Sequence, residues 1–160
     1  MQVSAILKGH DLFSNLSIED VNRISEFSER KSYRKNQMIF HYGDVGKHVF
    51  ILLEGKVLLR LPAQPNAFRI VVSGVAKGDL FGISPLLGSE RYTLEALAAS
   101  PVQALAIEAG KLRNLLETNS LVGFSIMSEV AQAYFTRYIE VLKSLQSIVT
   151  QIPLIESGGK

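Results

Sequence analysis

The residues best suited to bind an anion lie in the segment 78–100, GDLFGISPLLGSERYTLEALAAS. Within it, Ser84 can cap a one-turn helix that Pro85 begins and Gly88 ends. The N-terminus of a helix presents free N–H groups and a partial positive charge, and both attract anions. Arg91 follows this turn and can add a charge-assisted hydrogen bond. The segment therefore looks able to hold a phosphate or another small anion.

No other group of residues indicates a reaction. The chain has no cysteine, which excludes disulfides, thiolate metal sites and a cysteine nucleophile. It has no phosphate-binding P-loop, hydrolase elbow or zinc-protease motif. A histidine could ligate a haem, and Asp44 could join a metal site, but His10, His41 and His48 are scattered. We therefore predict no catalytic residue and no metal site.

Size and charge narrow the class of protein further. A chain of 160 residues, 47% of them hydrophobic and 20% charged, is expected to form one globular domain. The formal net charge is only +2, so a basic surface for DNA is not predicted. No stretch reaches the roughly eighteen apolar residues that cross a bilayer, and the N-terminal apolar run is too short for a signal peptide. We expect a cytoplasmic protein that binds no membrane.

The anion-binding segment is expected to be held by a β-structure. From about residue 31 to residue 108, turn residues separate short apolar or alternating runs: QMIF, HVFILL, KVLLRL, FRIVV, YTLEALAA and VQALAIE. Many short strands at this spacing predict a barrel or jelly roll. The pair Glu54-Gly55, between two such runs, predicts a tight hairpin in which glycine supplies a positive φ.

Helices are predicted on both sides of the strands. A helix over 17–27 has Ser17 as its N-cap and Asp20 three residues later, as in a capping box. A short helix is predicted over 111–119 and a long one over about 121–152. We expect residues 1–153 to form a single domain and residues 154–160 to be a disordered tail.

The long helix has more apolar residues than one face can bury. They form two seams: Val130, Tyr134, Val141, Leu145, Ile148 and Ile152; and Met127, Ala131, Phe135, Tyr138, Leu142 and Val149. One seam can cover the barrel, while the other needs a further partner. The alternative is a helix buried on two sides within one chain. Because a domain of this size offers little surface for that, we favour a parallel coiled-coil homodimer.

Three segments, LFSNLSIEDVNRI, RKNQMIFHYGDVGKHVFILLEGKV and GDLFG, together resemble the cyclic nucleotide-binding domain family. This family includes the sensory domain of the cyclic-AMP receptor protein and regulatory modules of some kinases and channels. The resemblance spans about residues 11–145 and depends on the placement of Gly43-Asp44, Gly55, Gly78-Asp79 and Phe81-Gly82. It implies a mainly β fold, a β-roll of the jelly-roll type, with flanking helices and a long C-terminal helix.

In this family, ligand specificity lies in a phosphate-binding cassette, which here is the segment 78–100 and is called the cassette below. The family pattern resembles Phe-Gly-Glu-Leu-Ala-Leu, then a loop and Pro-Arg-Ala-Ala. Its Glu binds the ribose, while backbone N–H groups and the Arg bind the cyclic phosphate. This chain has Ile83 in place of the Glu and Pro85 in place of the Ala, and Glu90 beside Arg91 can offset its charge. The two lost contacts correspond to an affinity lower by about a hundredfold to a thousandfold.

The resemblance implies a ligand site, which we place on both the cassette and the long helix. Gly82, Ser84 and Arg91 would hold the anion, with Ile83 beside them and with Tyr92 and Thr93 closing the rim. From the long helix, the candidates are Tyr134, Arg137 and Tyr138. The simpler interpretation is that these tyrosines are apolar bodies with solvated hydroxyls and that Arg137 faces solvent.

The predicted function is a non-catalytic sensory domain that binds cyclic AMP, cyclic GMP or another small anion. The alternative is a degenerate, ligand-free domain that acts in dimerisation or in binding another protein. Relatives that act on transcription carry a DNA-binding helix-turn-helix after the long helix. Here the sequence stops about seven residues after Pro153, so direct DNA binding is not predicted, and the chain is either complete or a fragment of a longer regulator.

Overall fold

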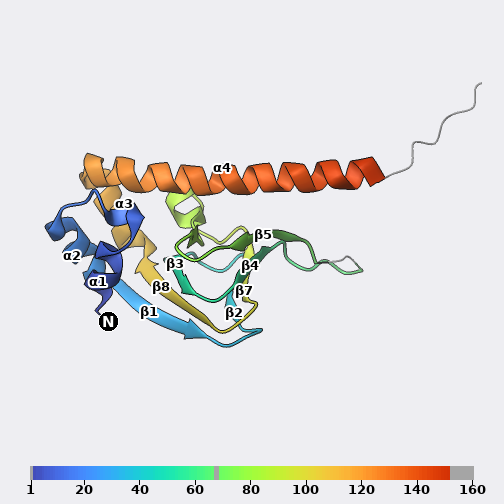
Figure 1. Cartoon of the computed structure of the whole chain (residues 1–160), viewed down its shortest axis with the longest axis horizontal. Helices are drawn as coiled ribbons and strands as arrows, with labels where there is room; N and C mark the ends of the chain where they lie inside the picture. The colour runs from blue at the N-terminus through green and yellow to red at the C-terminus, as the bar shows by residue number, and fades with distance from the viewer. Residues whose placement is uncertain (1, 67–68, 152–160) are drawn as a thin grey trace, which may run out of the picture.

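The computed structural model describes residues 2–66 and 69–151; Figure 1 shows a β-roll with helices at one end and a long helix across it. The helical elements are α1 (Val3–Lys8), the 3-10 turn η1 (Asp11–Phe13), α2 (Ile18–Glu26), the 3-10 turn η2 (Ser84–Leu87), α3 (Ala109–Thr118) and α4 (Ser120–Gln151). The strands are β1 (Ser28–Tyr33), β2 (Met38–Phe40), β3 (His48–Glu54), β4 (Val57–Arg60), β5 (Val71–Val75), β6 (Leu80–Phe81), β7 (Glu95–Ala98) and β8 (Val102–Glu108). The predicted jelly-roll class with flanking helices is confirmed, while the predicted tail over 154–160 lies outside the described residues.

Two four-stranded antiparallel sheets form the roll, with strand orders β1-β8-β3-β6 and β2-β7-β4-β5. The hairpin predicted at Glu54-Gly55 is wrong, because β3 pairs with β6 and β8 while β4 pairs with β5 and β7. Gly55 instead lies where the chain crosses from one sheet to the other. Its positive φ of 96° is as predicted, and a Cβ there would clash with the carbonyl oxygen of Pro101.

In the first sheet, the central strands β3 and β8 are buried on both faces. Alternate residues of β3 belong to different apolar clusters: Val49 and Ile51 pack with the helices, whereas Phe50 and Leu52 point into the roll. This two-sided burial explains why the run HVFILL is almost continuously apolar. The interior of the roll holds a group of stacked aromatic rings, Phe40, Phe50, Phe81 and Tyr92, among aliphatic side chains.

Two helices, α2 and α4, begin with a side-chain cap. Ser17 Oγ accepts a hydrogen bond from the backbone N–H of Asp20 at 3.1 Å, so the predicted N-cap of α2 is confirmed. The predicted helix over 111–119 corresponds to α3, which begins two residues earlier at Ala109. Asn119 then separates α3 from α4 and accepts a hydrogen bond through its side chain from the N–H of Val122.

One face of α4 packs on the rest of the chain. Val122, Ile126 and Val130 are fully buried, and the same face continues through half-buried residues at 133, 137 and 141. Of the first predicted seam, Val130 and Val141 lie on this face, whereas Tyr134, Leu145 and Ile148 are exposed; Ile152 lies outside the described residues. In the second seam Met127 is half-buried, and the members from Ala131 onward are exposed. Among the described helices, none combines the length and apolarity that crossing a membrane requires.

Candidate ligand-binding site

A cavity of about 460 Å³ lies between the second sheet, the cassette and α4. Its walls are formed by Phe40, Leu59, Leu61, Val72, Gly82, Ile83, Ser84, Tyr92, Thr93, Leu94, Tyr134, Arg137, Tyr138 and Val141. All the predicted site residues except Arg91 are in this set. The structure therefore brings the cassette and the predicted part of the long helix to one cavity, of a size typical for small-molecule sites.

The cassette contains a glycine that the aromatic core requires. Gly82 has a φ of +64°, and a Cβ there would lie 3.1 Å from ring atoms of both Phe40 and Phe50. The helical turn η2 then runs from Ser84 to Leu87. Ile83, rather than the predicted Ser84, is its N-cap and makes no side-chain capping bond. Because Ser84 is already helical, its hydroxyl is not used as a cap, and Gly88 ends the turn with a φ of +87° as predicted.

Two buried residues occupy the positions where the family pattern has Glu and Ala. Ile83 is 5% exposed and belongs to the apolar cluster that also holds Leu80. Pro85 is buried against Gly46, where a Cβ would clash with the proline ring. Neither side chain can hydrogen-bond, and of the two only Ile83 lines the cavity.

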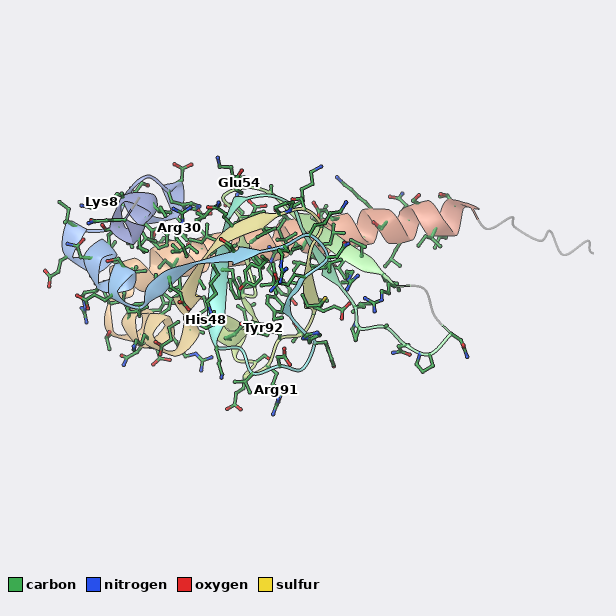
Figure 2. The ribbon with its side chains drawn as sticks, turned by 90° about the horizontal axis from the view of Figure 1, so that it is seen from below. Lys8, Arg30, His48, Glu54, Arg91 and Tyr92 are labelled. Carbon is green, nitrogen blue, oxygen red and sulfur yellow. The ribbon has the colours of Figure 1, made fainter. Side chains whose placement is uncertain are left out.

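Arg91 lies at the rim of the roll, outside the cavity walls. Its Nη1 donates a hydrogen bond of 2.7 Å to the carbonyl oxygen of Gly43, and the residue is exposed. An isolated bridge between Val45 and Arg91 fixes the backbone there. Figure 2 shows Arg91 at the edge of the molecule. The proposal that it binds a phosphate stays a prediction, since in this arrangement its guanidinium does not reach the cavity.

Arg137 is the charged side chain that does reach it. The residue is half-buried on α4, and its Nη2 donates a hydrogen bond to the carbonyl oxygen of Leu80. Burial lowers the pKa of this guanidinium, while the nearby charges of Asp79 and Glu140 oppose the shift. The interpretation of Arg137 as a solvent-facing side chain is therefore wrong, because α4 turns it toward the roll.

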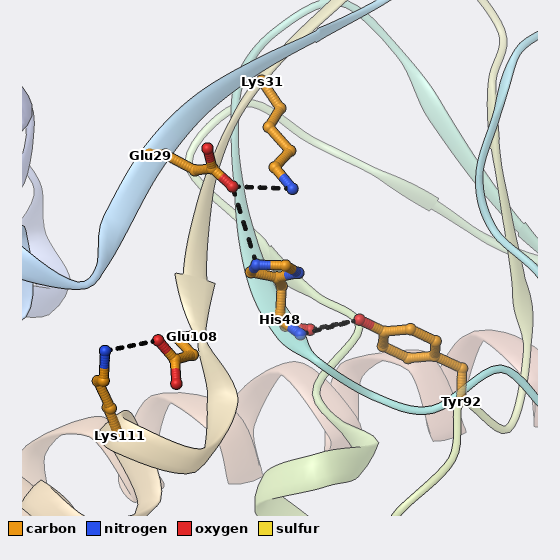
Figure 3. A network of polar contacts seen from close by, with 6 residues as sticks. All are labelled: Glu29, Lys31, His48, Tyr92, Glu108 and Lys111. Atoms are coloured by element: carbon orange, nitrogen blue, oxygen red, sulfur yellow. Dashed lines mark hydrogen bonds and ion pairs between the residues drawn. The ribbon is translucent and has the colours of Figure 1, made fainter.

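Tyr92 forms part of the inner wall and is fixed from two sides. Its ring stacks on Phe40 with 3.9 Å between centroids. Its hydroxyl accepts a hydrogen bond from the N–H of His48 at 3.1 Å and donates one of 2.7 Å to the carbonyl oxygen of His48 (Figure 3). Burial raises the pKa of this phenol. Because the hydroxyl is used at β3, Tyr92 offers the cavity its ring.

The tyrosines of α4 lie differently. Tyr134 is 60% exposed and Tyr138 54% exposed, although both line the cavity. They therefore form its solvent side, as the simpler interpretation of amphipathic side chains predicted. Thr93 is exposed on the opposite rim.

Sequence reasoning missed the apolar wall residues Phe40, Leu59, Leu61, Val72, Leu94 and Val141. All but Val141 lie in or beside predicted strands, and alternation along a strand could have marked those that face inward. Alternation could not have shown which inward residues lie at the end that α4 covers, because that depends on how the two sheets are connected.

The three histidines make separate contacts. His10 uses both ring nitrogens, Nδ1 accepting from the N–H of Leu12 and Nε2 bonding to the carbonyl oxygen of Gly78. In Figure 3, His48 lies near Glu29 and Lys31, with its Nε2 3.9 Å from Glu29 Oε1. Within the described ranges, no three His, Cys, Asp or Glu side chains come together in a group that could hold a metal ion.

Comparisons with known proteins point to one family. The sequence model of the cyclic nucleotide-binding domain matches residues 30–119. The cyclic AMP receptor protein of Thermus thermophilus is 26% identical over 129 residues, which cover 79% of this chain and 58% of that protein. An isozyme 2 form of cGMP-dependent protein kinase from Drosophila melanogaster is 26% identical over 72% of this chain but only 12% of the kinase. The chain thus spans about half of the first of these relatives and a small part of the second.

Solved structures agree with this match. A candidate cyclic nucleotide-binding protein from Geobacter metallireducens has a TM-score of 0.75 and 30% identity, covering 86% of this chain and 99% of that one. The regulatory domain of Toxoplasma gondii PKA, crystallised with cAMP, has a TM-score of 0.67 and 18% identity, covering 81% of this chain and 48% of that one. Because the identity with the Toxoplasma gondii domain is only 18%, that similarity shows a shared fold alone.

Proposed function

Because the chain belongs to the cyclic nucleotide-binding domain family, we propose that it is a non-catalytic regulatory domain that senses a small ligand in the cavity beneath α4. One observation carries this proposal: the cassette and strands form one wall of the cavity, while Tyr134, Arg137, Tyr138 and Val141 of α4 form the other. A ligand that contacts both walls binds more tightly when α4 lies against the roll. Its binding therefore shifts the equilibrium between positions of α4.

Cyclic AMP and cyclic GMP are the first ligands to test, because the relatives named above include a cyclic AMP receptor protein and a cGMP-dependent kinase. Ser84 and Thr93 are the polar cassette residues of the cavity, and Arg91 would have to leave Gly43 to reach a phosphate. The ligand's place in the cavity can be tested independently of its identity by filling the cavity.

We expect Val72→Trp to abolish ligand binding, because the larger side chain occupies the cavity that Val72 lines. Val71→Trp is the matched control, since Val71 is the exposed neighbour on β5 and is not a wall residue. The measurements are calorimetric titration and hydrogen exchange of α4 between residues 130 and 141. Binding that is unchanged in Val72→Trp would contradict the proposal.

A second candidate function is homodimerisation through α4. Exposed apolar side chains follow one another at spacings of three and four, in the heptad order Phe135, Tyr138, Leu142, Leu145 and Val149. Such a stripe is typical of one strand of a coiled coil. The two functions are compatible, because the stripe and the cavity side of α4 share only Tyr138.

A further inference from the structure

The cavity walls are mostly apolar and carry one positive charge. Most of them are aliphatic or aromatic, and Arg137 is the one charged residue among the described wall residues. Ser84 and Thr93 also line this cavity, as do Tyr134 and Tyr138, and none of these four hydroxyls makes a hydrogen bond within the described part of the chain. The cavity therefore offers a large apolar surface and one cationic corner.

The guanidinium of Arg137 has no carboxylate partner among the described residues at ion-pair distance. The two acidic groups that act on it from a distance are held by other donors. Glu140 Oε2 accepts a hydrogen bond of 2.8 Å from Ser73 Oγ, and Asp79 Oδ2 accepts one of 3.1 Å from the N–H of Ala76. The one hydrogen bond that Arg137 makes to a described residue uses Nη2 and the carbonyl of Leu80. Since a guanidinium carries five N–H donors, Arg137 can still bind an anion.

The same walls are poorly suited to a nucleotide. A ribose and a purine carry several hydrogen-bonding groups, which lose water when they enter a cavity and need protein partners there. Ile83 and Pro85 remove two such partners from the cassette, and Arg91 is bound to Gly43 at the rim. Hydroxyls and ring nitrogens facing Leu59, Val72 and Leu94 would remain without partners.

We propose that the ligand of this cavity is a carboxylic acid with an apolar body, whose carboxylate pairs with Arg137 while the body fills the space between the second sheet and α4. The inference rests on the proposed sensing function and specifies its ligand class. The hydroxyls of Ser84 and Thr93 are the further donors available to the carboxylate. Because Arg137 belongs to α4, the ion pair links the ligand directly to the helix whose position it controls.

Calorimetric titration with matched probes tests the proposal. The probes are decanoate and 4-phenylbutyrate, each compared with its neutral amide, together with cyclic AMP. We expect both carboxylates to bind the wild type at least tenfold more tightly than the amides. Val72→Trp should bind neither acid, which distinguishes the cavity from nonspecific adsorption on the exposed face of α4.

Three variants separate the roles of the arginines. Arg137→Gln should weaken binding of the acids by about ten- to a hundredfold, because it removes a charged hydrogen bond in a partly buried site. Arg137→Lys keeps the cation and should retain binding within about tenfold of the wild type, provided that circular dichroism confirms its fold. Arg91→Gln is the matched control and should leave the affinity for both acids unchanged.

The remaining outcomes of these titrations each contradict one part of the proposal: the ion pair, the ligand class or the sensing function. Equal binding of acids and amides, or an unchanged affinity in Arg137→Gln, would overturn the ion pair while sensing by the cavity stands. Tight binding of cyclic AMP that requires Arg91 would overturn the ligand class and support the sensing function with the family ligand. If no probe binds at millimolar concentration, the carboxylate proposal is overturned, whereas a probe that binds and leaves the hydrogen exchange of α4 unchanged would overturn sensing instead.

Discussion

Tyr92 shows how one side chain can stabilise the core and shape the cavity together. Its two hydrogen bonds attach the cassette to the start of β3, and its ring lines the cavity beside Phe40. The side chain is 5% exposed, and its contacts with His48 are partly buried.

Tyr92→Phe is expected to lower the free energy of unfolding by about 1–2 kcal/mol, because the N–H and carbonyl of His48 lose their partner. Urea denaturation measures this change. Tyr134→Phe is the control: its ring is 60% exposed, and we expect a change within about 0.5 kcal/mol. Equal effects of the two substitutions would show that the His48 contacts contribute nothing to stability.

Tyr33 should make the stability sensitive to alkaline pH. Burial, assisted by the charges of Tyr92 and Glu29, raises its pKa to about 12. The folded state therefore disfavours the phenolate. This contribution to stability is complete below the unfolded pKa of about 10 and is lost as the pH rises from about 10 to about 12.

Comparison of the wild type with Tyr33→Phe isolates this effect from other groups that titrate at alkaline pH. The ring is half-buried, so solvent screening keeps the slope below the limit that the full shift allows. In urea denaturation between pH 9 and pH 12, the wild type should lose more stability than the variant. Parallel curves would contradict the prediction.

Arg137 and Arg91 show how far the role of a residue could be predicted from the sequence. Arg137 interrupts an apolar stretch of the helix, and that break in the pattern singled it out; it lines the cavity, and its role in binding stays a prediction. Arg91 matched the family position equally well, yet its side chain is bound to a carbonyl on another loop. The choice between cavity and rim depends on a side-chain rotamer and a partner 48 residues away, which no local pattern records.

Among the elements, the corner at Gly55 joins the two sheets. Gly43, at another turn, has a similar positive φ of 83°, but a Cβ there would meet no neighbouring atom within 4 Å. The two glycines therefore share a backbone conformation and differ in steric surroundings.

Gly55→Ala should lower the free energy of unfolding by about 3 kcal/mol or more, because it adds a steric clash with the Pro101 carbonyl to the strain of a positive φ. Gly43→Ala carries the φ strain without the clash and should lower it by about 1 kcal/mol. Chemical denaturation of both variants gives the difference between them. A similar loss in the two proteins would mean that the corner relaxes and that its packing is not specific.

The order of elements was largely predictable, and their pairing was not. Apolar runs with turn residues between them correctly indicated β3, β4, β7 and β8. β1 was missed because its sequence, SERKSY, is polar, and its ladder with β8 runs from Ser28 opposite Ile107 to Tyr33 opposite Val102. The Glu54-Gly55 turn was mistaken for a hairpin because a tight turn looks the same whether the next strand pairs with the last one or leaves for another sheet.

For the whole molecule, the exposed heptad stripe of α4 should decide the oligomeric state. We expect a dimer by sedimentation at tens of micromolar, and a monomer for Leu142→Glu/Leu145→Glu, because two carboxylates would be desolvated in an apolar interface. The dissociation constant should rise at least about a hundredfold.

Ser144→Glu/Ser147→Glu adds the same charge on the opposite side of the helix and should remain dimeric. Both serines are exposed and lie off the stripe, so the control keeps the net charge and the helix position matched. A monomeric wild type, or dissociation caused equally by both double substitutions, would contradict dimerisation through this stripe.

The C-terminal part of α4 extends beyond its contacts with the roll. Helix contacts with the roll end near Val141, and the described residues from Leu142 to Thr150 are all exposed, so this part of the helix projects past the strands (Figure 1). A rigid overhang of about 15 Å acts as a lever, and a tilt of about 20° at the cavity would move its tip by about 5 Å. A ligand too small to span the domain can in this way produce a displacement that a neighbouring protein surface would register.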